Sequence, residues 1–167
     1  RDRAFVTQLV YGTLENRLTL DWRIDQFLEG NKEIDQTVRE ILRMGAYELC
    51  YMDAAPDRAA VNEAVSLARY AKKSSAGSLI NAVLRSLIRD GKPLKLPDRK
   101  ADPMRYLSVK YGCPEWIVGQ WTAQYGEEDA EGLVESSVSR PPLYARVNTL
   151  KTSADALAAL LREQGVQ

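Results

Sequence analysis

The sequence contains no histidine, and this absence excludes several common kinds of catalytic and metal site. Without imidazole there is no Ser-His-Asp triad, no histidine-bound metal and no histidine general acid or base. Only two cysteines occur, Cys50 and Cys113, and their wide separation forms neither a disulfide framework nor a CxxC metal motif. Glycine-rich loops of the GxGxxG or P-loop kind are also missing from the sequence. We therefore predict that this chain holds no catalytic residue, no cofactor and no metal.

Long hydrophobic runs are missing as well. The longest, 156–161, has six residues, whereas a helix that spans a bilayer needs about 20. No signal-peptide pattern opens the chain, so we predict a cytoplasmic protein with no membrane contact. The sequence begins inside an amphipathic pattern and stops just after a helix, and we expect it to be part of a longer protein.

Apolar residues recur at helical spacing through the first ninety residues. The stripes predict five helices. The first covers about 2–17, the second runs from a cap at Thr19 to Gly30, and the third begins at Asp35. The last two cover about 57–73 and about 75–90. Isolated helices of this length are marginal in water, so their apolar stripes must bury against one another. Short connections make neighbours antiparallel. The predicted fold class is therefore all-α, an antiparallel helical bundle.

Some residues within these helices are expected to serve packing rather than chemistry. Glycine inside a helix costs about 1 kcal/mol relative to alanine, so Gly12 and Gly45 indicate close helix–helix contacts. Trp22, Trp116 and Trp121 could stack on bases, but at helical spacing we interpret them as core residues.

The pattern changes after residue 91. Residues 91–102 read as a linker, and Asp102-Pro103 and Cys113-Pro114 are typical helix starts. An acidic helix is expected over 127–138. Residues 143–149 alternate between two faces and predict a strand, after which Thr152-Ser153 caps a last helix. We therefore divide the chain into a helical domain (1–91), a helical extension (92–140) and the truncated start of an α+β domain (141–167).

Charge is balanced overall but segregated along the chain. The sequence has 23 basic and 23 acidic residues, which excludes a globally basic nucleic-acid binder. Residues 69–100, however, hold nine basic and two acidic residues, a net charge of +7. One interpretation is a solvated surface with cations near helix C-termini, where the macrodipole favours them. The other is a patch that contacts phosphates of RNA or DNA. For the second interpretation the candidate residues here are Lys72, Lys73, Arg85, Arg89 and Lys92.

Six segments of the first ninety residues form a pattern whose order and spacing are specific, although each segment alone is a modest signal. They are Asp2–Val6, Leu9–Leu14, Leu20–Trp22, Arg43–Leu49, Ala59–Val65 and Leu79–Arg85. Together they resemble one known family, the NusB-like domain of bacterial 16S ribosomal RNA methyltransferases of the RsmB (Sun/Fmu) type.

The segment Pro141–Lys151 resembles the start of the RNA-binding region that precedes the catalytic domain in cytosine-C5 RNA methyltransferases. The resemblance implies a parent enzyme that transfers a methyl group from S-adenosylmethionine to carbon 5 of a cytosine in ribosomal RNA. It adds Arg146, Asn148 and Lys151 as candidate RNA-binding residues. Neither Cys50 nor Cys113 lies in one of the family's catalytic motifs, so the resemblance implies a non-catalytic RNA-binding and targeting module with ribosomal RNA as its partner.

Two alternatives stay open at this point. The chain could be a transcription antitermination factor of the NusB type, which binds RNA and protein partners without enzymatic activity. It could also be a protein–protein module, because the helix that precedes Arg1 in NusB-like domains is missing and apolar surface would be exposed for a protein partner or a dimer.

Overall fold

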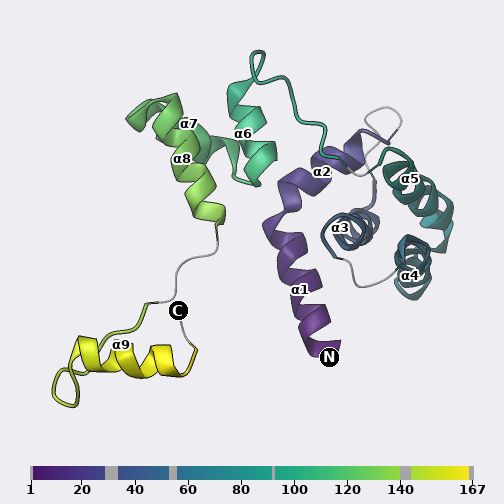
Figure 1. Ribbon diagram of the computed structural model, residues 1–167. Helices are drawn as coiled ribbons and strands as arrows, with labels where there is room; N and C mark the ends of the chain where they lie inside the picture. The colour runs from purple at the N-terminus through teal and green to yellow at the C-terminus, as the bar shows by residue number, and fades with distance from the viewer. Residues whose placement is uncertain (1, 29–33, 53–55, 92, 140–143, 166–167) are drawn as a thin grey trace.

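The computed structural model describes residues 2–28, 34–52, 56–91, 93–139 and 144–165, and its regular elements are all helices (Figure 1). The predicted all-α class is therefore confirmed for the described residues. In chain order the elements are α1 (Asp2–Glu15), α2 (Arg17–Asp25), α3 (Gln36–Tyr51), α4 (Asp57–Tyr70), the 3₁₀ turn η1 (Ser74–Ala76), α5 (Gly77–Arg89), α6 (Pro103–Tyr111), α7 (Glu115–Tyr125), α8 (Glu127–Val138) and α9 (Ala154–Glu163).

Side-chain caps fix where several helices begin. The Asp35 carboxylate accepts hydrogen bonds from the amides of Thr37 (2.9 Å) and Val38 (3.3 Å), which are unpaired donors at the start of α3. Asp102 likewise caps α6, with Pro103 in the first turn. At α9 the cap is Ser153, whose hydroxyl accepts from the Ala156 amide at 3.2 Å.

The expected cap at Thr19 is wrong. The chain bends at Asn16, α2 begins at Arg17, and Thr19 is buried inside its first turn. The Thr19 hydroxyl instead donates to the carbonyl of Val109 in α6 at 2.6 Å, so a distant partner satisfies it. The predicted end at Gly30 lies outside the described residues, and α2 ends at Asp25.

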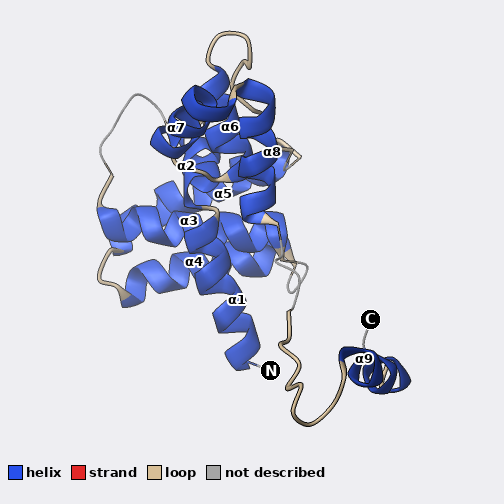
Figure 2. Cartoon of the chain, turned by 90° about the vertical axis from the view of Figure 1, so that its left-hand side faces the viewer, coloured by secondary structure: helices blue, strands red, loops and turns tan. Residues whose placement is uncertain are grey.

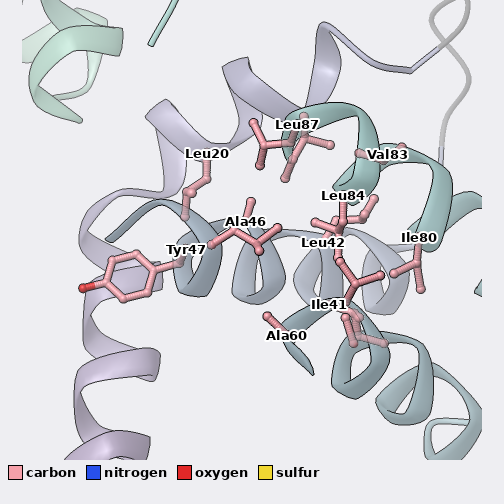
Figure 3. Packing of buried hydrophobic residues seen from close by; sticks show 14 of the residues in the cluster. Leu20, Ile41, Leu42, Ala46, Tyr47, Ala60, Ile80, Val83, Leu84 and Leu87 are labelled. Carbon is pink, nitrogen blue, oxygen red and sulfur yellow. The ribbon is translucent and has the colours of Figure 1, made fainter. Parts of the chain in front are cut away.

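The core of the first five helices is built around α3, which packs against α1, α2, α4 and α5. Figure 3 shows apolar side chains of α2, α4 and α5, among them Leu20, Ala60 and Leu84, meeting those of α3. The close contacts expected at the two helical glycines are present. A Cβ on Gly45 would lie 2.8 Å from a methyl carbon of Leu84, and one on Gly12 would lie 2.0 Å from the Tyr47 ring.

Helices α6–α8 enclose a second, smaller cluster around Leu107, Val118 and Val134. This cluster is attached to the first through the contact between α2 and α6. There the Trp22 indole donates to the carbonyl of Lys95 at 2.6 Å. Trp22 and Trp121 are partly buried, but Trp116 is 70% exposed, so the expectation of a core role is wrong for Trp116.

The strand predicted over 143–149 is not formed in the described residues. Leu143 lies outside them, and residues 144–148 have irregular backbone followed by a turn. A strand needs a neighbouring strand to pair its backbone groups, and none of the described residues provides one (Figure 2). The α9 helix lies apart from the other helices and has no buried residue.

Candidate nucleic-acid interface

Arg85 and Arg89 lie one turn apart on the exposed side of α5, as predicted. The Arg85 Nε donates to Asn81 Oδ1 at 2.9 Å, and an Arg89 nitrogen donates to Ser86 Oγ at 2.8 Å. Across the described ranges neither guanidinium forms an ion pair with a carboxylate. Both therefore keep their charge available to an external anion.

These two arginines line a surface pocket of about 700 Å³ between α4 and α5, together with Arg58. Its floor is apolar and includes Val61 and Ala82. Three guanidinium groups at one pocket suit a phosphate group, since arginine offers several donors in a planar fork. Asp57, at the start of α4, also lines this pocket and contributes one negative charge.

Sequence reasoning missed Arg58, because it lies outside the basic stretch at 69–100. The signal that could have found it is topological. An antiparallel pair of α4 and α5 places the first turn of α4 beside the last turns of α5, which carry Arg85 and Arg89.

The other lysine candidates lie elsewhere. Lys72 and Lys73 follow the C-terminus of α4, at the opposite end from Arg58. Lys73 Nζ pairs with Asp35 Oδ2 at 2.6 Å, and this hydrogen bond lowers the pKa of the Asp35 carboxyl. The charge of Lys73 is thus largely balanced within the chain, while Lys72 is exposed with a left-handed backbone (φ 59°). Lys92 lies outside the described residues.

The three candidates from the downstream segment are separate from the α4–α5 surface. Arg146, Asn148 and Lys151 are exposed in the irregular stretch before α9 (Figure 1). The Asn148 side chain accepts a hydrogen bond from the Leu150 amide at 3.1 Å and so stabilises the local turn. The structure therefore does not bring the predicted residues into one continuous site.

Much of the positive charge predicted over 69–100 is balanced by nearby carboxylates. Lys95 pairs with Asp90 at 2.5 Å, and Arg99 pairs with Glu131 of α8 at 2.6 Å. Lys110 also reaches Glu131, at 3.1 Å. Glu131 of the acidic helix thus pairs with basic residues of the extension, whereas Arg69, Arg85 and Arg89 of α4 and α5 are in none of the ion pairs between described residues.

The two cysteines have different surroundings. Cys113 is buried, and burial raises the pKa of its thiol. Cys50 accepts a hydrogen bond from Arg23 at 3.2 Å. Over the residues that the structure describes, no group of three His, Cys, Asp or Glu side chains could hold a metal ion, and no helix is long and apolar enough to cross a membrane.

The described residues form an all-α fold, a helical bundle centred on α3 with an arginine-lined surface between α4 and α5. The profile of the NusB family matches residues 1–89, and the chain belongs to this family. A second family, described as "Methyltr_RsmF/B-like, ferredoxin-like domain", matches residues 113–167. The resemblance stated from the sequence is therefore confirmed, whereas the domain boundaries at 91 and 140 stay a prediction.

Curated relatives match along essentially the whole chain. The chain is 34% identical over 167 residues to the "Probable ribosomal RNA small subunit methyltransferase B" of Bacillus subtilis (strain 168), covering 100% of this chain and 37% of the relative. It is 33% identical to the protein of the same name from Synechocystis sp., covering 97% of this chain and 36% of the relative. It is also 33% identical to "Ribosomal RNA small subunit methyltransferase B" of Escherichia coli O139:H28, covering 100% of this chain and 37% of the relative. The chain thus spans little more than a third of these relatives.

The described residues do not fit a site for S-adenosylmethionine, the cofactor that the resemblance implies for the parent enzyme. Such a nucleotide-type cofactor is held where a glycine-rich turn joins a strand to a helix. The described glycines with positive φ, Gly91, Gly112, Gly126 and Gly165, instead all follow the ends of helices. No step of methyl transfer is therefore assigned to this chain.

Proposed function

We propose that this chain is the non-catalytic RNA-binding and targeting part of an S-adenosylmethionine-dependent ribosomal RNA (cytosine-C5) methyltransferase. The observation that carries the proposal is the similarity along the whole chain to proteins named ribosomal RNA small subunit methyltransferase B. The similarity includes both the NusB part and the ferredoxin-like part. In this proposal the parent protein acts in the cytoplasm, and the methyl donor binds to another part of it.

The physical role of the chain is to add affinity and orientation. Contacts to phosphates position a protein on a nucleic acid without reading its sequence, and folded RNA is recognised largely by its shape, phosphates and 2′-hydroxyls. A rigid helical bundle with exposed arginines provides such contacts at fixed positions. The catalytic part can then meet the target cytosine with less conformational entropy to lose.

Two measurements test this proposal together. The chain should bind a 16S ribosomal RNA transcript with an affinity that falls steeply with salt concentration. With S-adenosylmethionine added, it should transfer no methyl group to the same transcript. Methyl transfer by the chain itself, or no RNA affinity even at low salt, would refute the assignment.

The NusB family match favours one second candidate, an RNA- and protein-binding regulator of transcription. It predicts that the chain changes transcription past a terminator in a purified transcription system. The targeting proposal predicts no effect in that assay, so the two candidates give opposite results.

A further inference from the structure

The arginine-lined pocket is one of two hollows between α4 and α5, and the two together are here named the α4–α5 groove. The first half, of about 700 Å³, is lined by the first turns of α4 and the last turns of α5. A second hollow of about 370 Å³ is lined by the last turns of α4 and the first turns of α5. Because α4 and α5 are in contact and opposite ends of each helix line the two hollows, the hollows follow one another along this pair of helices.

The second hollow is polar, in contrast to the apolar floor of the first. Its lining residues include Asn62, Ser66 and Arg69 from α4 and Ser78 and Asn81 from α5. Amides and hydroxyls both donate and accept hydrogen bonds, and they suit the 2′-hydroxyl and phosphate oxygens of RNA. Arg69 is exposed and, within the described part of the chain, pairs with no carboxylate.

The charge of the groove favours a polyanion. Its lining contains four arginines, Arg58, Arg69, Arg85 and Arg89, against a single carboxylate, Asp57. Arg58 and Arg69 are eleven positions apart on α4, which at 1.5 Å per residue places them about 16 Å apart along the helix. That length corresponds to about five nucleotides of a stacked strand.

An exposed aromatic residue directly follows, in the sequence, the last residue of α4 that lines the polar hollow. Tyr70 is 88% exposed and follows Arg69 at the end of α4, one helical turn after Ser66. It belongs to neither hydrophobic cluster. Exposed aromatic rings beside a basic groove bind unstacked bases, which only a single strand offers.

We propose that the α4–α5 groove binds a single-stranded segment of RNA, with the arginines on its phosphates and one base stacked on Tyr70. This inference rests on the proposed function and specifies the site and the form of RNA that it takes. An acidic peptide would satisfy the arginines but would offer no base to the tyrosine ring. A duplex would touch the arginines from outside and leave Tyr70 without a base.

The first test reverses charge inside the groove and, as a matched control, outside it. The variant Arg58→Glu/Arg85→Glu is compared with Arg3→Glu/Arg17→Glu, which alters two exposed arginines of α1 and α2 and has the same net charge. Binding of a single-stranded 12-nucleotide RNA is measured by fluorescence anisotropy at several salt concentrations. Each lost phosphate contact lowers the slope of log affinity against log salt by about 0.7.

The groove variant should bind at least about tenfold more weakly than the control variant, with a slope smaller by about 1.4 for two lost contacts. Circular dichroism should show that both variants remain helical, since neither pair of arginines is buried. Equal affinities of the two variants would overturn the proposal, and so would a decamer of glutamate that competes as well as the RNA.

The second test concerns the base. Tyr70→Ala should weaken single-strand binding about fivefold or more, while Tyr70→Phe, which keeps the ring, should retain it. Neither change should affect binding of a blunt duplex of the same sequence. If Tyr70→Ala loses the same affinity for the duplex as for the single strand, or loses affinity for neither, the assignment of a single strand is overturned.

The failure of this inference can be told apart from failure of the proposed function. If the unaltered chain binds RNA and the groove variant binds it as tightly as the control variant, the groove is excluded while the RNA-binding function stands. If the unaltered chain binds neither single-stranded nor duplex RNA at low salt, both are refuted.

Discussion

Gly12 shows how one missing side chain allows two helices to approach. Replacing it with alanine would place a Cβ 2.0 Å from the ring of Tyr47, which is itself buried against the core. We expect Gly12→Ala to destabilise the protein by about 1–3 kcal/mol, because the ring must leave its packed position. The matched control is Gly132→Ala in α8, where no atom lies within 4 Å of the added Cβ.

For Gly132→Ala the better helix propensity of alanine should dominate, with a gain of up to about 1 kcal/mol. Thermal unfolding followed by circular dichroism measures both variants. Shifts of the melting temperature in the same direction would show that packing at Gly12 does not decide the effect.

Glu48 gives the stability of the bundle a dependence on pH. It lines a hollow between α1, α3 and α4, where burial and, less strongly, the charge of Glu63 raise its carboxyl pKa. A raised pKa in the folded state means that folding disfavours the ionised form. The ionised carboxylate therefore lowers stability above the folded-state pKa, and this loss disappears as the pH falls through that pKa to the ordinary value near 4.5.

Replacing Glu48 with glutamine should therefore raise the melting temperature at pH 7 and change it little at pH 4. Glu135→Gln on the exposed side of α8 removes the same charge and serves as the control. A gain from Glu48→Gln that is equally large at both pH values would mean that packing, and not ionisation, is responsible.

At the scale of elements, α2 and α3 are joined by an ion pair. Arg43 of α3 donates to both carboxylate oxygens of Asp21 in α2, at 2.8 and 2.7 Å, and its side chain is only 12% exposed. Such a two-point contact fixes the angle between the helices as well as adding stability. Arg43 also pairs with Glu40, one turn earlier on α3.

Asp21→Asn should destabilise the protein by about 1–3 kcal/mol, because a largely buried guanidinium loses the charge of the carboxylate that accepts two of its hydrogen bonds and keeps only its more exposed partner, Glu40. Glu40→Gln removes the same charge from the more exposed partner of Arg43, where surface pairs contribute about 0–1 kcal/mol. Urea unfolding of the two variants measures the difference. If the two variants lose the same free energy of unfolding, the assigned role of the Arg43–Asp21 ion pair between α2 and α3 is contradicted.

The helices of the bundle were predictable because apolar spacing and local caps act within a few residues. Asp35 and Asp102 cap the helices that the sequence assigns to them, and Gly45 lies at a close contact as expected. Thr19 was assigned wrongly because its partner, Val109, is ninety positions away. The alternation over 143–149 predicted a strand, but a strand depends on a neighbour that no local pattern supplies.

The candidate site was only partly predictable for the same reason. Arg85 and Arg89 follow from helical spacing, whereas Arg58 joins them only when α4 and α5 are placed side by side. Lys73 was chosen for its charge, yet its partner Asp35 lies thirty-eight positions earlier in the sequence. Counting charges along the chain finds a basic region, but three-dimensional pairing decides which charges remain available.

At the scale of the whole molecule, the two hydrophobic clusters and α9 should differ in local stability. The extension α6–α8 is attached to the bundle by buried contacts such as the hydrogen bond from Thr19 to Val109. The residues before and within α9 lack such contacts: Leu150 is 96% exposed and α9 has no buried residue. Backbone amides in elements without buried contacts open with little free-energy cost.

We therefore expect native-state hydrogen exchange to separate the chain into two classes. Amides of α9 should exchange close to the rate of an unstructured peptide, while those in the middle of α3 and α5 should exchange only on global unfolding. Helices α6–α8 should be protected to an extent comparable with the bundle, because they have a buried cluster of their own and α6 packs against α2 of the bundle. Amide protection of α9 equal to that of α3 would mean that α9 packs against the bundle in solution. The RNA-binding candidates Arg146 and Lys151 would then lie close to the bundle.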